Sequence, residues 1–212
     1  MTKVCIVGNG GSALDSKKGR EVDDCDVVIR MGMCPLKGYG DHVGTKTSIY
    51  STGLSYKKFY DTKKAGLFEL SKEVWSFVPV GPVPNGITKW EQDFVKDWEQ
   101  SSRDYLNKAE TGLCGESVVS IDYSKALEVV RDLGLTGMNN NMGEFLRPSL
   151  GFFTVYKSMM EFSGSCISLL GFDFFNSGWY WDLTHKCNHK HSPFLEKVWI
   201  NTKISEGSLK WL

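Results

Sequence analysis

The sequence predicts an α/β protein with a mostly parallel sheet flanked by helices, folded as a single domain over residues 1–212. Two observations lead to this fold class. Short runs rich in valine and isoleucine end in glycine or aspartate turns, and segments with apolar residues at helical spacing lie between them. The length of 212 residues allows a substantial core and suits one domain. Ligands of such folds bind at the carboxyl ends of the strands.

Three strands are expected within the first fifty residues. They are Lys3–Val7, Asp26–Arg30 and Thr47–Ser51, each an apolar run bounded by Gly or Asp turn chemistry. A strand buried on both faces is recognised by such a continuous run. The first strand is followed at once by the glycine-rich turn Gly8–Ser12, in which Ser12 is placed to cap a following helix.

The middle of the chain alternates between helical and extended patterns. Tyr56–Glu73 and Lys89–Ala109 carry aromatic residues at helical spacing with charges between them, which predicts two amphipathic helices. Val74–Val83 lies between them and is predicted as a strand. Prolines at its end predict a rigid loop there rather than a helix. Ser124–Leu133 is predicted as a further helix, ended by Gly134.

The last third of the chain repeats the alternation. Thr136–Gly143 is rich in Asn and Gly and predicts a loop. The turn Arg147–Gly151 leads into an apolar helix over Phe152–Phe162, and Cys166–Gly171 is predicted as a strand. An aromatic-rich segment, Gly171–Asp182, follows that strand, so a tyrosine hydroxyl there could donate a hydrogen bond to a departing phosphate.

Composition narrows the classes of partner and location. Lys+Arg and Asp+Glu number 25 each, so no global positive field attracts nucleic acid or an anionic membrane, although a local patch of Lys186, Lys190 and Lys197 could face phosphates. No apolar run approaches the roughly 20 residues of a membrane span, and no signal sequence is evident. A cytoplasmic location is therefore expected, and the alternative is that the sequence is an excised catalytic portion. Six cysteines without a CxxC framework predict reduced, mostly buried thiols.

The turn Gly8–Ser12 is the first candidate for chemistry. Its glycines remove side chains where a ligand would approach, and they leave N–H groups to meet phosphate or ribose oxygens at a helix start. The spacing fits neither the G-x-G-x-x-G fingerprint nor a Walker loop. The turn therefore favours nucleotide binding, and the alternative is a tight strand-to-helix turn without a ligand.

The second candidate is Thr184–His191, which contains three of the four histidines and one cysteine. Zinc binding is an alternative here, but the segment lacks the usual C-x₂₋₄-C and H-x₃₋₅-H spacing. A neutral imidazole in this segment could instead deprotonate a hydroxyl near pH 7. Asp24-Cys25-Asp26 spells D-x-D, but it precedes its strand and is interpreted as a turn, so metal dependence is not expected.

Taken together, these segments resemble the sialylmotifs of the sialyltransferases, both bacterial and animal. Residues from Val7 to Thr47 resemble the large motif, including Asp26–Met31. Arg147–Gly151 with Leu169–Phe174 resembles the small motif, and His191-Ser192-Pro193-Phe194-Leu195-Glu196 matches the very small motif. The order of the three motifs is also that of the family.

The resemblance implies a variant of the nucleotide-sugar transferase fold, GT-A-like and Rossmann-type, that works without a metal by an inverting single displacement. It makes His191 the general base and places Tyr180 or Trp181 at the leaving phosphate, with catalytic roles for His191 and Tyr180. No cofactor is implied beyond the nucleotide sugar, with CMP as the expected nucleotide. The residues that it assigns to nucleotide and donor binding are Gly8, Asn9, Gly10, Ser12, Gly32, Ser51, Thr52, Ser149, Leu150, Gly151, Asp173 and Trp181.

The chain departs from the family at several positions. Gly32 and Ser51 stand where the family or its bacterial members carry asparagine, and both positions contact the donor. Phe175 stands where the bacterial enzymes have the second tyrosine of a phosphate-binding pair. Cys5 and Cys166 are each slightly out of register with the cysteine pair of the animal motifs.

The resulting hypothesis is a metal-independent glycosyltransferase that moves a sugar, first of all sialic acid from CMP-sialic acid, to an acceptor hydroxyl. Its partners would be the nucleotide-sugar donor and a glycan or another hydroxyl-bearing acceptor. One alternative keeps the chemistry with another sugar, such as Kdo or a pentose, and a non-glycan acceptor such as a hydroxylated nucleobase. The other alternative is a nucleotide-binding module without transferase activity.

Overall fold

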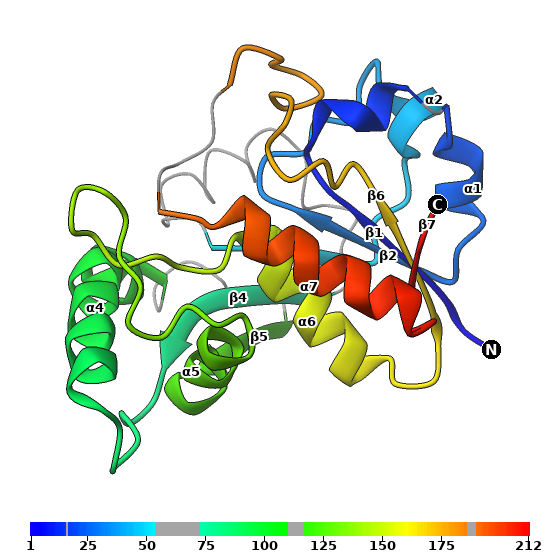
Figure 1. Cartoon of the computed structure of the whole chain (residues 1–212). Coiled ribbons are helices and arrows are strands. Elements are labelled where there is room, and N and C mark those ends of the chain that lie inside the picture. Colours follow the sequence, from blue (N-terminus) through cyan, green and yellow to red (C-terminus); the bar gives the residue numbers. More distant parts are fainter. Residues whose placement is uncertain (16, 54–72, 110–116, 186–189) are drawn as a thin grey trace.

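The computed structural model describes residues 1–15, 17–53, 73–109, 117–185 and 190–212. Its centre is a seven-stranded sheet with the order β5-β4-β3-β2-β1-β6-β7, in which neighbouring strands run parallel (Figure 1). The predicted parallel α/β fold is therefore confirmed. The strands are β1 (Lys3–Val7), β2 (Val27–Met31), β3 (Ile49–Thr52), β4 (Glu73–Val80), β5 (Ser117–Asp122), β6 (Cys166–Leu170) and β7 (Leu209–Trp211).

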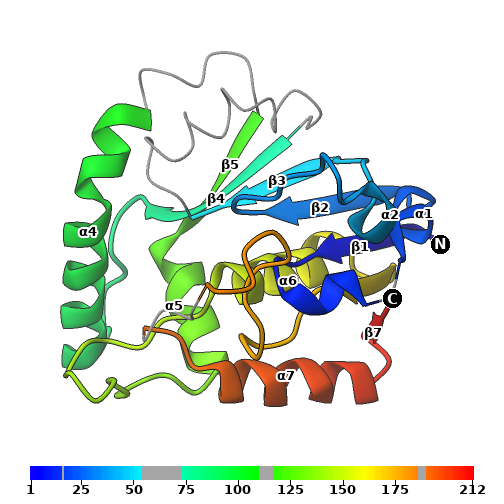
Figure 2. The same cartoon turned by 90° about the horizontal axis from the view of Figure 1, so that it is seen from above.

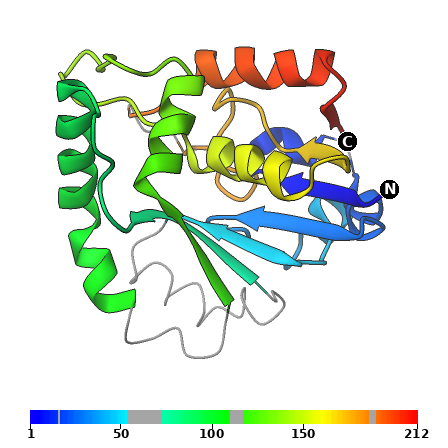
Figure 3. The same cartoon turned by 90° about the horizontal axis from the view of Figure 1, so that it is seen from below.

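Helices cover both faces of the sheet. Helices α5, α6 and α7 lie on one face, and α4 stands beside the β4 end of the sheet (Figures 2 and 3). The short helices η1, α1 and α2 pack on the opposite face over β1 and β2. Their bounds are η1 (Gly11–Leu14), α1 (Gly19–Asp23), α2 (Gly40–Val43), α4 (Lys89–Ala109), α5 (Tyr123–Asp132), α6 (Leu150–Glu161) and α7 (Pro193–Ser205).

Alternation along β1 explains why both faces are covered. Successive side chains of a strand point to opposite faces of the sheet. Val4 and Ile6 belong to the core cluster that includes Phe152 of α6, whereas Cys5 and Val7 belong to the cluster of η1, α1 and α2. All four β1 side chains are buried, which is why this strand has the continuous apolar sequence of a central strand.

Most expected elements are present, with small shifts of their ends. The predicted helix Lys89–Ala109 has those bounds in α4, and the helix expected over 56–73 lies outside the described residues apart from Glu73, which begins β4. Strands β5 and β7 and helix α7 were not expected. Ser12 does not cap a helix, because η1 begins at Gly11 with Gly10 as its N-cap, which makes no side-chain cap bond.

The cysteines agree with the expected reduced state in the part of the chain that is described. Cys5, Cys25, Cys34 and Cys166 are free thiols, while residues 114 and 187 fall outside the described ranges. In the β1–β6 pairing Cys5 lies opposite Ser168, two positions away from Cys166, so these two thiols are out of register. Among the described helices, none has the length and apolar character needed to cross a membrane.

The strand order creates a crevice next to β1. From β1 the chain moves strand by strand to β5 at one edge, and then returns to place β6 on the other side of β1. A parallel sheet opens for ligands at such a switch point, outside the carboxyl ends of its strands. Gly8, Gly32, Gly53 and Gly171 directly follow β1, β2, β3 and β6, so four glycines stand at this edge.

Candidate active site

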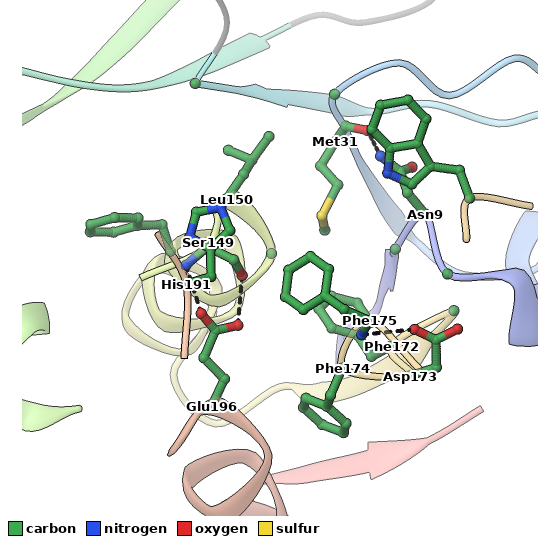
Figure 4. Close-up of a pocket in the computed structure, with 18 of the residues that line it drawn as sticks. Asn9, Met31, Ser149, Leu150, Phe172, Asp173, Phe174, Phe175, His191 and Glu196 are labelled. Carbon is green, nitrogen blue, oxygen red and sulfur yellow. Dashed lines mark hydrogen bonds between the residues drawn. The ribbon is translucent and has the colours of Figure 1, made fainter. Parts of the chain in front are cut away.

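A cavity of about 530 Å³ lies at the carboxyl edge of the sheet. This volume is within the range of small-molecule sites, roughly 300–1,000 Å³. The four glycines that follow the strands line it, together with the start of α6, the loop after β6 and the residues just before α7. Figure 4 shows Asn9 on one side of this cavity and His191 with Ser149 on the other.

The glycine turn and the loop after β6 are in direct backbone contact. The Gly8 N–H donates to the Leu170 carbonyl at 2.7 Å, and the Gly10 N–H donates to the Gly171 carbonyl at 2.9 Å. A Cβ atom on Gly8 would lie 2.4 Å from the Gly171 carbonyl oxygen, which is far inside van der Waals contact. Glycine at position 8 is therefore required for the close approach of two backbones.

The N–H groups of Gly8, Gly10, Gly11 and Ser12 in this turn face acceptors within the protein. The Gly11 N–H donates to the Ser177 hydroxyl at 2.7 Å and to the Gly178 carbonyl at 2.8 Å. The Ser12 N–H faces a carboxylate oxygen of Asp173 at 3.4 Å. These four N–H groups therefore have acceptors within the protein, because the loop after β6 packs against the turn. Binding of a nucleotide by the turn stays a prediction.

Asn9 leaves an open acceptor at the cavity. Its side-chain Nδ2 donates to the Met31 carbonyl at 3.1 Å, as Figure 4 shows, and its buried Oδ1 has no partner among the described residues. Gly32 has a φ of +58°, and a Cβ there would lie 3.2 Å from Asn9 Nδ2. A hydroxyl or amino group of a ligand would supply the missing hydrogen bond, since an unpartnered buried acceptor is costly.

The start of α6 forms the opposite wall. The Ser149 hydroxyl accepts the Phe152 N–H at 3.1 Å and so caps the helix. Buried Glu196 of α7 holds Ser149 with both carboxyl oxygens, at 2.7 Å from its backbone nitrogen and 2.6 Å from its hydroxyl oxygen (Figure 4). Burial raises the pKa of Glu196 to about 7, although the two bonds from Ser149 oppose the shift.

His191 has the geometry of a base. Its Nδ1 lies 3.1 Å from the Arg147 carbonyl oxygen, which can only accept, so Nδ1 carries the hydrogen and Nε2 keeps a lone pair in the neutral ring. Burial lowers the pKa of His191 below its usual range, and the bond to Arg147 offsets part of this effect. The Phe175 ring stacks on the imidazole with centroids 5.8 Å apart and an angle of 11° between the planes.

Strained backbone in the loop after β6 positions that aromatic ring. Phe174 and Phe175 have φ values of 55° and 63°, in the left-handed region that side-chain-bearing residues rarely adopt. Asp173 holds the conformation by accepting the Phe175 N–H at 3.1 Å, and the Ser177 hydroxyl donates to the same carboxylate. The strain is concentrated next to the imidazole, where Phe175 meets it.

Two predicted donor residues on β3 lie away from the cavity. The Ser51 hydroxyl is fully buried, 2.5 Å from the Thr154 hydroxyl of α6. Thr52 is also buried and does not line the cavity, whereas the next residue, Gly53, does. The strand therefore contributes its end, and its hydroxyl side chains face the interior.

The structure does not bring Tyr180 to the cavity. Its hydroxyl donates to the Pro35 carbonyl at 2.9 Å, and its buried ring packs edge-on against Tyr39 at 5.1 Å. Trp181 stacks on Trp179 at 5.0 Å and is likewise absent from the lining, which Trp179 joins. The position next to Tyr180, rather than Tyr180 itself, faces the cavity.

The predicted site residues thus divide into two groups. Nine of them line the cavity and five do not. Glu196, Phe175, Trp179 and His185 line it without having been predicted as site residues, although Glu196 was within the recognised motif and His185 within the histidine-rich segment. The nine are Gly8, Asn9, Gly10, Gly32, Ser149, Leu150, Gly151, Asp173 and His191, and the five are Ser12, Ser51, Thr52, Tyr180 and Trp181.

Metal ligands do not gather in the described ranges. No group of three or more His, Cys, Asp or Glu side chains there could hold a metal ion. Residues 186–189 of the histidine-rich segment lie outside those ranges, so zinc binding by that segment is untested and metal independence stays a prediction.

Comparisons with solved structures show the same fold. A mammalian sialyltransferase in complex with Gal-beta-1-3GalNAc-ortho-nitrophenol gives a TM-score of 0.65 at 17% identity, over 100% of this chain and 69% of that one. The sialyltransferase CstII from Campylobacter jejuni, in complex with the substrate analogue cytidine-5'-monophosphate, gives 0.55 at 18% identity, over 100% and 80%.

Sequence comparisons identify the family. Mouse alpha-N-acetylgalactosaminide alpha-2,6-sialyltransferase 1 is 51% identical over 45 residues, which are 21% of this chain and 9% of that protein. Rat lactosylceramide alpha-2,3-sialyltransferase is 45% identical over 51 residues, 24% of this chain and 13% of that protein, so each match spans a small part of the relative's length. The family model of glycosyltransferase family 29 (sialyltransferase) matches residues 1–204. The chain therefore belongs to glycosyltransferase family 29, the sialyltransferases.

Proposed function

We propose that this chain transfers sialic acid from CMP-sialic acid to a hydroxyl of a glycan acceptor, with inversion and with His191 as the general base. The observation that carries the proposal is the neutral imidazole in the cavity, whose Nδ1 is fixed on the Arg147 carbonyl. Membership of the sialyltransferase family supports the donor class.

The chemistry follows from that geometry. Nε2 of His191 takes the proton of the acceptor hydroxyl while its oxygen forms a bond to the anomeric carbon of the donor. The bond between that carbon and the phosphate oxygen breaks, and its electron pair leaves with CMP. Because attack and departure occur on opposite faces of the anomeric carbon, a single displacement inverts its configuration. No step requires a metal ion, so activity in EDTA is expected.

The proposed donor contacts lie on two walls of the cavity. Asn9 Oδ1 is an acceptor for an amino or hydroxyl group of the nucleotide. Helix α6 begins at Leu150, and the positive end of a helix dipole favours an anionic group nearby. Glu196 fixes this helix start through Ser149 and so acts as a positioning residue.

The donor is tested by binding and turnover of the whole chain in EDTA. Calorimetry with CMP, UMP and GMP should detect CMP alone, and mass spectrometry should detect CMP release from CMP-sialic acid with an acceptor. If CMP were released from CMP-Kdo and not from CMP-sialic acid, the donor sugar would be Kdo instead of sialic acid. CMP binding without turnover of any activated sugar would favour the binding-module alternative, and loss of activity in EDTA would contradict metal independence.

The base is tested with His191→Gln. The matched control is His42→Gln, because His42 lies in helix α2 on the face of the sheet that η1, α1 and α2 cover. His191→Gln should lower kcat by about 10²–10⁴-fold, the usual contribution of general base catalysis, and keep CMP affinity. The wild-type rate should fall as pH drops through the lowered pKa of His191, below its ordinary value of 6.5, because the protonated ring cannot accept. Full turnover by His191→Gln would rule out the assignment.

A further inference from the structure

We propose that Cys5 and Cys25 form a disulfide bond when the protein reacts with a peroxide, so that β1 is joined covalently to the turn before β2. Cys5 is in the middle of β1, and Cys25 lies between the end of α1 and the start of β2. Both belong to the core cluster under η1, α1 and α2, and neither lines the cavity. The inference is therefore independent of the proposed function.

The two thiols contact each other in the reduced protein. The side chains of Cys5 and Cys25 share a hydrogen bond. Cys25 Sγ donates its own hydrogen to the Glu21 carbonyl oxygen at 3.4 Å, so Cys5 is the donor between the two sulfur atoms. A disulfide needs its sulfur atoms about 2.0 Å apart, so a short approach separates this pair from the bonded state. Cys25 lies in a bend and can shift toward Cys5 without breaking the pairing of β1 with β2.

Hydrogen bonds hold the turn against the start of β1. The Asp26 carboxylate, next to Cys25 in the chain, accepts the Lys3 N–H at 2.8 Å. The Lys46 ammonium group donates to the Cys25 carbonyl. Two reacting groups that the fold holds together combine in a unimolecular step, which is far faster than an encounter in solution. An oxidised Cys25 would therefore meet Cys5 before any other thiol.

Cys25 is the thiol that reacts first. The hydrogen bond from Cys5 lowers the pKa of Cys25 and is the largest influence on it. Lys3 and Lys46 lower this pKa further, while burial and Asp26 act in the opposite direction. The same hydrogen bond and burial raise the pKa of Cys5. Because the thiolate is the form that attacks an oxidant, and Cys25 is 6% exposed whereas Cys5 is 0% exposed, a small peroxide meets Cys25.

The reaction balances with hydrogen peroxide as the oxidant. The Cys25 thiolate attacks one peroxide oxygen, the O–O bond breaks, and Cys25 becomes a sulfenic acid while the other oxygen leaves as hydroxide and takes up a proton. The Cys5 sulfur then attacks the Cys25 sulfur, the S–O bond breaks, and the departing hydroxide takes the Cys5 proton. Two thiols lose two electrons, and one peroxide is reduced to two water molecules.

The other described cysteines are not placed for this reaction. Cys166 lies opposite Lys3 in the β1–β6 pairing, two positions from Cys5 along the strand. Strand spacing and rise put the Cα atoms of Cys5 and Cys166 about 8 Å apart, beyond the separation of about 7 Å that a disulfide spans. Cys34 belongs to a separate cluster with Tyr50 and Val74. Among the described cysteines, the fold brings Cys5 and Cys25 together.

The test treats the reduced full chain with one equivalent of hydrogen peroxide. After alkylation of the remaining thiols, peptide mapping by mass spectrometry without reductant should find Cys5 joined to Cys25. The matched controls Cys34→Ser and Cys166→Ser should keep this bond. In Cys5→Ser the reaction should stop at the sulfenic acid, so dimedone should label Cys25, whereas Cys25→Ser should leave Cys5 unlabelled.

Urea unfolding of the oxidised and reduced wild type measures the effect on stability. A disulfide that closes a loop of about 20 residues should raise the folding equilibrium constant by about 10²-fold, because it restricts the unfolded chain. The urea midpoint should therefore rise on oxidation and return to its first value in dithiothreitol.

Each result decides the proposal. Cys5 or Cys25 joined to another cysteine, or both still free after the peroxide is consumed, would refute it. A lower urea midpoint for the oxidised protein would show that the fold does not hold the pair in disulfide geometry, and would refute it as well. Should a serine variant not fold, the peptide map of wild type decides alone.

Discussion

Replacing Glu196 by glutamine should stabilise the protein relative to wild type above pH 7 and change it little near pH 4. Ser149 donates both its hydroxyl and its N–H to the Glu196 carboxyl group. A glutamine side chain can hold the same two atoms, because its Oε1 accepts the N–H and its Nε2 donates to the hydroxyl oxygen. Glutamine has no charge to bury. Wild type must instead ionise a carboxyl group that is 3% exposed as the pH rises.

The size of the effect follows from the pKa of Glu196 in the two states. Burial raises it from 4.5 to about 7 in the folded protein. Because the pKa of Glu196 is higher in the folded protein than in the unfolded chain, its contribution to the free energy of unfolding is fully present below pH 4.5. This contribution is lost as the pH rises through about 7. At about 1.4 kcal/mol per pKa step, the loss amounts to about 3 kcal/mol at pH 8.

Urea unfolding at pH 4 and pH 8 measures this difference directly. The contributions of the other titrating groups to the free energy of unfolding cancel, because each variant is compared with wild type at the same pH. The control is Glu206→Gln, the same change in an exposed ion pair at the end of α7, which should shift stability by less than about 1 kcal/mol at either pH. If Glu196→Gln were less stable than wild type at pH 8, the structure would require the carboxylate, and the reasoning would be wrong.

Three further substitutions separate residues that make contacts within the protein from residues that contact the ligand. Gly8→Ala places a Cβ 2.4 Å from the Gly171 carbonyl oxygen, and it should cost about 2 kcal/mol or more and abolish CMP binding. Gly53→Ala, where the nearest atom lies at 3.8 Å, should change stability by less than about 1 kcal/mol, and equal losses for both variants would contradict the packing argument. Ser51→Ala should lose about 1 kcal/mol through its bond to Thr154 and keep CMP affinity in calorimetry. Weakened CMP binding by Ser51→Ala would instead place that hydroxyl at the donor.

The sequence predicted the strands that are buried on both faces and missed those at the edges. Strands β1, β2 and β6 adjoin one another in the middle of the sheet and have continuous apolar runs. Strand β5 is an edge strand with serine and aspartate at its ends, and β7 is an edge strand of three residues. Neither has a pattern that separates it from a loop, because the sequence signal of a strand comes from burial.

Positions along the backbone of the site were predictable, and side-chain directions were not. The carboxyl ends of parallel strands meet at one edge, so Gly8 and Gly32 could be placed together from the apolar runs that precede them. The direction of Tyr180 depends on the path of a loop, and its hydroxyl meets Pro35 instead of the cavity. The bond between Glu196 and Ser149 joins residues 47 positions apart, which no local pattern reveals.

The pairing of β1 with β6 has a consequence for how the chain folds. Lys3 lies opposite Cys166, so the first strand remains without one of its two neighbours until most of the chain is available. Contacts between residues far apart in sequence form slowly, because a long loop must close before they are made. During synthesis the floor of the cavity cannot exist until β6 has left the ribosome. Nucleotide binding should therefore arise with the slowest phase of refolding, and a chain that stops before β6 should have no donor site.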